Sequence, residues 1–150
     1  MKGILKNILI SVGCAYIFGQ AQILLSSDYL TKFLKDNLIM IQITLLAINT
    51  ASLSIVLSKI RDLIDKSKTI NSFDKTKDAM FLSIKEQICL IFLSLALLIL
   101  NESLLVKSFL YWPQIIEIAI ITCFVYSITI LYDTATSVFV ILSFNNNKED

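Results

Sequence analysis

The sequence predicts an all-α polytopic membrane protein with four transmembrane helices, and two observations carry that prediction. Apolar residues make up 56% of the 150 residues, more than an ordinary soluble domain of this size contains. Most Lys and Arg residues lie between positions 59 and 85, whereas the long apolar runs carry almost none. Charge that is confined to the segments between apolar runs is typical of a multi-pass membrane protein. We expect a single domain over residues 1–150.

Four apolar stretches reach the roughly 20 residues that a membrane helix needs. They cover about 4–25, 38–57, 88–106, and 114 through 130 and onward. The runs do not alternate apolar and polar residues, so they favour helices over a closed barrel. The opening "MKGILKNILISVGCAYIFGQA" also fits a cleaved signal peptide, but we expect an uncleaved first helix.

The basic residues predict the orientation of the helices. Lys2 and Lys6 precede the first span, the basic cluster follows the second, and Lys148 lies in the tail. Because basic loops stay in the cytoplasm, we expect both termini inside and a location in the bacterial inner membrane. Trp112 is then an outer aromatic anchor, with Pro113 in the first turn of the fourth helix.

Two connecting segments are expected to have structure of their own. The segment before the second span, "SSDYLTKFLKDN", is predicted to be an amphipathic turn at the outer surface. Its apolar residues are expected to face lipid; they are Tyr29, Leu30, Phe33 and Leu34. The segment between the second and third spans lacks Gly and Pro. It continues the apolar faces of both helices, which predicts a cytoplasmic helical hairpin at about 59–86 that turns near 69–72.

The hairpin has two interpretations, a solvated helical pair or a docking surface for a cytosolic protein. Its mixed charges argue against a patch for anionic lipid headgroups, which would be more uniformly basic. The fourth apolar run continues to Phe144, about 46 Å at helical rise. We therefore expect its last turns to leave the membrane and pack beside the hairpin. The candidate docking residues are Arg61, Asp65, Lys68, Phe73, Lys77 and Phe81.

Small residues form one face on each of the first two predicted helices. Such faces allow membrane helices to approach closely. We expect the first helix to pack on the second, and one of the two faces can instead be an interface between subunits. The second helix carries Thr44 and Ser58 on this face as well. The candidate packing residues are Ser11, Ala15 and Gly19, and Ala47, Ala51 and Ser54.

A polar stripe with helical spacing runs along the fourth helix. It consists of Thr122, Tyr126, Thr129, Asp133 and Thr136. Asp133 lies about 20 residues after Pro113, which is one hydrocarbon thickness, so it is expected near the inner headgroups. The stripe should face protein or water, either as interhelical hydrogen bonds or as the lining of a central aqueous path. Glu117 lies on nearly the opposite face and is expected to snorkel or to bond Gln114.

The residue types exclude most catalytic chemistry. The chain has no histidine, and Cys14, Cys89 and Cys123 have no metal-binding spacing. An intramembrane aspartyl protease needs two opposed aspartates, and the spans offer only Asp133, with no second carboxylate within helical reach. The net charge of +1 gives no reason to expect nucleic-acid binding. We expect neither an enzyme nor a cofactor or metal.

In its architecture the chain resembles the membrane subunit of the Kiwa anti-phage system. The resemblance rests on four spans, inside termini and the mixed-charge hairpin "KIRDLIDKSKTINSFDKTKD". It implies a homo-oligomer, with a tetramer as the expected size, and a cytosolic partner subunit that binds nucleic acid. It also implies that the complex senses phage attack at the inner membrane.

Two functions from different classes therefore compete. The first is an oligomeric inner-membrane scaffold or sensor that recruits or regulates a cytosolic effector in anti-phage defence. The alternative is a channel or holin-like effector that depolarises the membrane. In that case the Thr122 to Thr136 stripe lines the pore and Asp133 forms a ring that favours cations.

Overall fold

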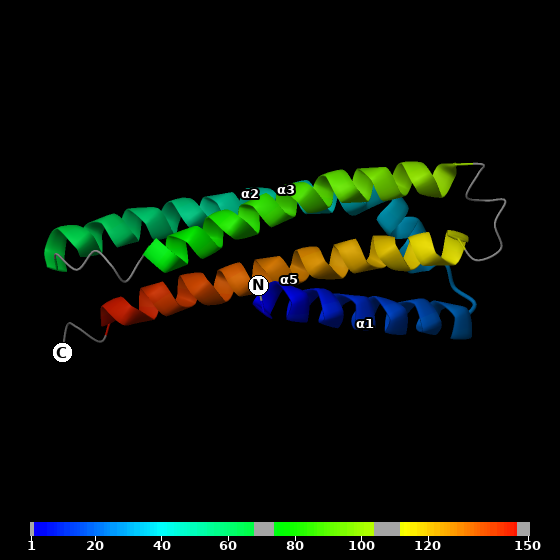
Figure 1. The fold of residues 1–150 in the computed structure, drawn as a ribbon, viewed down its shortest axis with the longest axis horizontal. Helices are drawn as coiled ribbons and strands as arrows, with labels where there is room; N and C mark the ends of the chain where they lie inside the picture. The colour runs from blue at the N-terminus through cyan, green and yellow to red at the C-terminus, as the bar shows by residue number, and fades with distance from the viewer. Residues whose placement is uncertain (1, 68–73, 104–111, 147–150) are drawn as a thin grey trace.

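The described part of the protein is a bundle of four long helices. The computed structural model describes residues 2–67, 74–103 and 112–146, and all four elements in these ranges are α-helical (Figure 1). Each helix is long and apolar enough to cross a membrane. The predicted all-α class is therefore confirmed, and the helices are those of a multi-pass membrane protein. The four helices are α1 (Lys2–Leu24), α2 (Tyr29–Ser67), α3 (Asp74–Glu102) and α5 (Trp112–Asn146).

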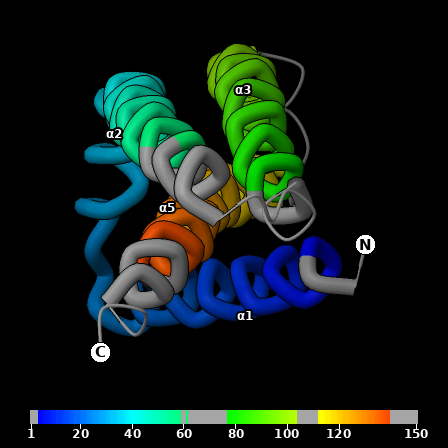
Figure 2. Tube along the Cα trace, turned by 90° about the vertical axis from the view of Figure 1, so that its left-hand side faces the viewer, coloured from blue at the N-terminus to red at the C-terminus, as the bar shows by residue number. Residues whose placement is uncertain are grey.

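Helix α5 is the centre of the bundle. It packs on each of the other three helices, and α2 and α3 also pack on each other. Figure 2 shows α5 between α1 on one side and the α2–α3 pair on the other. The main apolar cluster reflects this arrangement, since it joins Ala15 of α1 and Leu34 of α2 to Ile120 of α5. Every part of the bundle is thus held through α5.

The small-residue face of α1 packs along α5, not along α2 as predicted. Ser11 and Ala15 are completely buried on this face. A Cβ atom at Gly19 would lie 3.5 Å from Cγ1 of Ile118, in ordinary contact with α5. Small residues permit a close approach but do not specify the partner helix, which explains why spacing alone gave the wrong neighbour.

The matching face of α2 has no partner within the bundle. Its small residues lie on the outside of the helix and are exposed. These residues include all three predicted packing positions, Ala47, Ala51 and Ser54. The face is therefore available to lipid or to another chain.

A tight turn joins α1 to α2 and makes α2 longer at its start than predicted. Ser26 has a positive φ of 49°, and the amide of Ser27 bonds the carbonyl of Gln22 at 3.0 Å. These features form a helix-ending motif that usually contains glycine. Because α2 then begins at Tyr29, most of the predicted surface turn is helical.

Only two of the four residues that were predicted to face lipid at the start of α2 are exposed. Tyr29 and Phe33 are exposed as predicted, whereas Leu34 is completely buried and Leu30 packs against the core. In an α-helix Tyr29 and Phe33 form one row and Leu30 and Leu34 form the neighbouring row, and the bundle packs against the second row.

Helices α2 and α5 are much longer than one membrane crossing requires. At 1.5 Å per residue, the 39 residues of α2 span about 58 Å and the 35 residues of α5 about 52 Å. The hydrocarbon core of a bilayer is roughly 30 Å thick. Val138 of α5 packs against a cluster of Val56 from α2 and Met80 from α3, so the three helices stay together at this end. The predicted hairpin turn at 69–72 lies outside the described residues.

The buried face of α1 gives a stability prediction. Ala15→Leu should lower the free energy of unfolding by about 1–3 kcal/mol, because the added carbons overpack the contact with α5. Gly13→Leu is the matched control, since a Cβ atom at Gly13 meets nothing within 4 Å. The measurement is unfolding in detergent followed by helicity. Equal effects of the two variants would contradict the packing of α1 on α5.

Candidate functional site: a polar seam and two polar ends

A buried hydrogen-bonded rung joins α2, α3 and α5. Gln42 is completely buried, and its Nε2 donates to Ser94 Oγ at 2.8 Å and to Ser127 Oγ at 3.2 Å. The three side chains come from three different helices, so a single carboxamide fixes their relative positions. Between membrane helices such bonds are worth about 0.6 kcal/mol on average and up to about 1.7 kcal/mol.

A second buried rung lies two helical turns further along the same seam. Asn49 Nδ2 donates to Gln87 Oε1 at 2.5 Å, and both side chains are buried. Asn49 follows Gln42 by seven residues on α2, and Gln87 precedes Ser94 by seven residues on α3. A repeat of seven on two antiparallel helices is the pattern of left-handed coiled-coil packing. The rungs thus fix the register between α2 and α3.

The pattern of apolar residues along the chain does not predict this polar seam. Carboxamides are rare inside apolar spans, so Gln42 and Asn49 were visible as candidates, and their spacing of seven was a second signal. Gln87 lies at the edge of its predicted span, where polar residues are common, so its position does not indicate a buried hydrogen bond. Only the antiparallel pairing of α2 with α3 brings the two amides together.

The predicted polar stripe of α5 divides into two groups in the structure. Its threonines donate to carbonyls of their own helix four residues earlier. Such bonds satisfy a hydroxyl in an apolar environment without any partner helix. The remaining two side chains bond other helices: Tyr126 donates to Glu86 Oε2 at 3.3 Å, and Asp133 Oδ2 accepts from Asn7 Nδ2 at 2.6 Å. The three threonines are Thr122, Thr129 and Thr136.

An acidic cleft of about 210 Å³ lies beside the start of α1, partway along α5. It is lined by residues of α1, α3 and α5, among them Asn7, Glu86 and Asp133. The sequence offered no second carboxylate within helical reach of Asp133, and the structure brings one from another helix, since Glu86 of α3 lines the same cleft. Among the described residues, no group of three His, Cys, Asp or Glu side chains could hold a metal ion.

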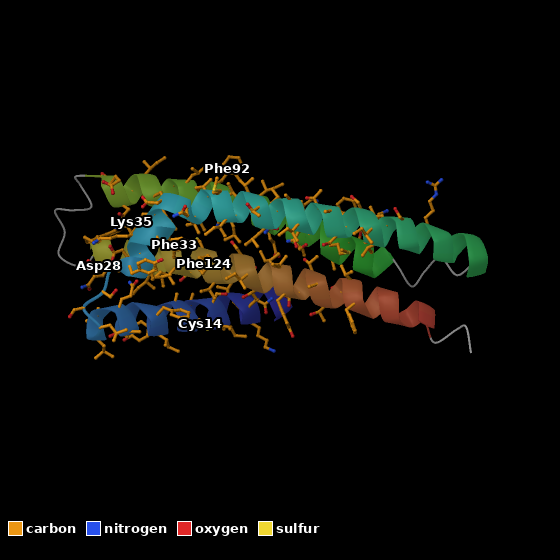
Figure 3. The ribbon with its side chains drawn as sticks, turned by 180° about the vertical axis from the view of Figure 1, so that it is seen from behind. Cys14, Asp28, Phe33, Lys35, Phe92 and Phe124 are labelled. Carbon is orange, nitrogen blue, oxygen red and sulfur yellow. The ribbon has the colours of Figure 1, made fainter. Side chains whose placement is uncertain are left out.

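An ion pair joins α2 to α5 at the end of the bundle near the turn between α1 and α2. Lys35 Nζ of α2 lies 3.2 Å from Glu117 Oε1 of α5, and both side chains are partly exposed. Glu117 thus pairs with another helix instead of bonding Gln114. Figure 3 shows Lys35 beside Asp28 and Phe33 at this end. A cavity of about 260 Å³ lies next to the pair, lined by residues of α1, α5 and the turn between α1 and α2.

Exposed aromatic residues mark both ends of the apolar zone. Tyr29 and Phe33 stack with ring centroids 6.3 Å apart, at the end where Trp112 is exposed as well. Tyr132 is exposed near the other end. The 20 residues from Trp112 to Tyr132 rise about 30 Å, the thickness of a hydrocarbon core. If Trp112 and Tyr132 mark the two surfaces of the hydrocarbon core, Asp133 lies at one surface of that core and not at its centre.

The predicted docking residues are described only in part. Arg61, Lys77 and Phe81 are exposed on α2 and α3. The side chains of Asp65, Lys68 and Phe73 lie outside the described part of the chain. The docking surface therefore stays a prediction.

Comparison of the chain with protein-family models, with curated proteins and with solved structures finds no match.

The seam predicts that Gln42 is important for stability. Gln42→Leu should lower the free energy of unfolding by about 1–2 kcal/mol, because the bonds to Ser94 and Ser127 are lost. Thr44→Val on the outer face of the same helix is the control, since Thr44 bonds only the carbonyl of Met40 in its own helix. Thermal unfolding in detergent makes the comparison. A Gln42→Leu variant as stable as Thr44→Val would rule out a structural role for the rung.

The ion pair predicts rescue by charge exchange. Glu117→Lys places two lysines together and should lower the unfolding temperature, and Lys35→Glu should do the same with two acids. The double variant restores an opposite pair and should recover most of the loss. Unfolding temperatures at low and high salt provide the measurement, with the single-variant loss smaller at high salt. No recovery in the double variant would show that the two charges do not interact.

Proposed function

We propose that this chain is a non-enzymatic, oligomeric membrane scaffold that recruits or regulates a soluble effector. Under this proposal it lies in the bacterial inner membrane with both termini inside, and its helical extension stands in the cytoplasm. The setting is anti-phage defence, as the architectural resemblance to the Kiwa membrane subunit implies. The expected assembly is a homo-oligomer, a tetramer, with a cytosolic protein as partner.

The observation that carries the proposal is the length of α2 and α5 relative to one membrane crossing. Helix α2 continues past Ser58 through the charged segment 59–67, and α5, which is apolar as far as Phe144, continues to Asn146. Both helices are therefore longer than the roughly 30 Å of a hydrocarbon core. A plain membrane anchor needs no such extension. The cluster of Val56, Met80 and Val138 packs the three helices together where they approach this extension. A soluble protein would thus meet a firm helical surface.

The outward face of α2 supports the oligomeric part of the proposal. Its small residues are exposed in the single chain, whereas the equivalent face of α1 is used within the bundle. A small-residue face permits the close helix approach on which membrane helix association depends. The subunit contact therefore belongs on α2.

The alternative proposal is a channel formed between several copies of the chain. It is supported by the position of Asp133 and Thr136, which are exposed on α5 and not enclosed within the bundle. In an oligomer these residues could surround a shared path, with Asp133 as the charged ring. The seam within one chain does not serve this purpose, since its side chains are buried and bonded to one another.

Purification of the tagged protein in mild detergent tests the scaffold proposal. A discrete oligomer should appear in mass photometry together with a stoichiometric soluble protein. Arg61→Glu and Phe81→Ala should reduce recovery of that protein at least several-fold, because both side chains are exposed near the extension. Asp133→Asn is the control and should leave recovery unchanged.

The opposite result would favour the channel. A bare oligomer whose conductance in planar bilayers falls in Asp133→Asn, and which carries no soluble protein, would overturn the scaffold proposal.

A further inference from the structure

The Asn49–Gln87 rung leaves two polar groups without a partner. Asn49 Nδ2 donates to Gln87 Oε1, but Asn49 Oδ1 and Gln87 Nε2 bond no atom of the described chain. Both side chains are at least 99% buried. In an apolar environment an unsatisfied amide group costs several kcal/mol, so a buried donor and acceptor side by side need an explanation.

We propose that the Asn49–Gln87 rung binds one internal water molecule. The oxygen and nitrogen of a carboxamide lie roughly 2.2 Å apart, so the two unpartnered atoms flank the pair that is already bonded. A water molecule between them accepts a hydrogen bond from Gln87 Nε2 and donates one to Asn49 Oδ1. Buried waters typically make 2–4 hydrogen bonds of this kind to groups that the protein leaves unsatisfied.

Mostly apolar layers lie next to this rung along the bundle. On one side lies the apolar cluster of Leu53, Val56 and Met80. On the other side, towards the rung of Gln42, Leu90 and Ile130 are buried. These apolar side chains offer no hydrogen bonds to further waters. Gln42 Oε1 also lacks a partner in the described chain, but it lies two turns away on α2. The inference is independent of the proposed scaffold function, because it concerns the interior of a single chain.

Solid-state NMR of the full chain in bilayers tests the proposal, with lipids deuterated so that water and lipid are distinguished. Gln87 Nε2 should show a cross-peak to protons at the water frequency, and the peak should vanish in D₂O. The backbone amides of Ile120 and Ile121, which are buried among apolar groups, should show none. A Gln87 Nε2 that instead correlates with the Asn49 carboxamide, without a water peak, would overturn the proposal in favour of a closed amide pair.

Variants test whether the water bridges the two residues. In Asn49→Leu the acceptor is removed, and the water cross-peak of Gln87 should be lost. Ser52→Ala, one turn along α2 and only partly buried, is the matched control and should retain it. A peak that persists in Asn49→Leu would overturn the bridge. The measurement on the unchanged chain decides the proposal even if the Asn49→Leu variant does not fold.

Discussion

The structure depends on one constraint, that polar groups in an apolar environment must find partners inside the protein. Helix formation meets this requirement for the backbone. The hydroxyls of Thr122 and Thr129 meet it by bonding carbonyls of their own helix. A carboxamide carries an acceptor oxygen as well as donor hydrogens, and carbonyls of its own helix can bond only the donors, as Phe33 does for Asn37. Gln42 and Asn49 therefore need residues from α3 and α5, and this need ties the helices together.

The same constraint fixes the arrangement of the helices more sharply than apolar packing does. Lipid and leucine are about equally apolar, so no hydrophobic driving force favours one register of α2 against α3 over another. Apolar packing alone therefore permits several registers. The two polar rungs, seven residues apart on each helix, form their hydrogen bonds between α2 and α3 together in the observed register. Helix α1 bonds α2 near their connecting turn, where Gln22 Nε2 donates to Thr31 Oγ1 at 2.8 Å. Its small-residue face packs on α5, with the Asn7–Asp133 bond at one end. The central position of α5 follows from these attachments.

The proposed function uses the ends and the outer surface of the bundle, not its interior. The seam is closed by its own hydrogen bonds and by apolar layers on both sides. The acidic cleft lies towards the end that carries the long extensions of α2 and α5, and the other end carries the Lys35–Glu117 pair. A single chain of this kind already has the exposed surface on which a scaffold would bind other proteins at one side of the membrane. A channel would have to be assembled from several copies.

The sequence by itself determined the class of the protein, because apolar runs of membrane length leave the backbone few alternatives to helices. It also predicts a boundary position for Asp133, because that prediction depends only on the rise per residue from Pro113. Tertiary structure decided which faces meet. Spacing along one helix marks Ala15 and Gly19 as a close-packing face but cannot show that α5 is the partner. Likewise, Glu86 comes close to Asp133, and Gln87 to Asn49, only through helix pairing, which no periodicity within a single helix records.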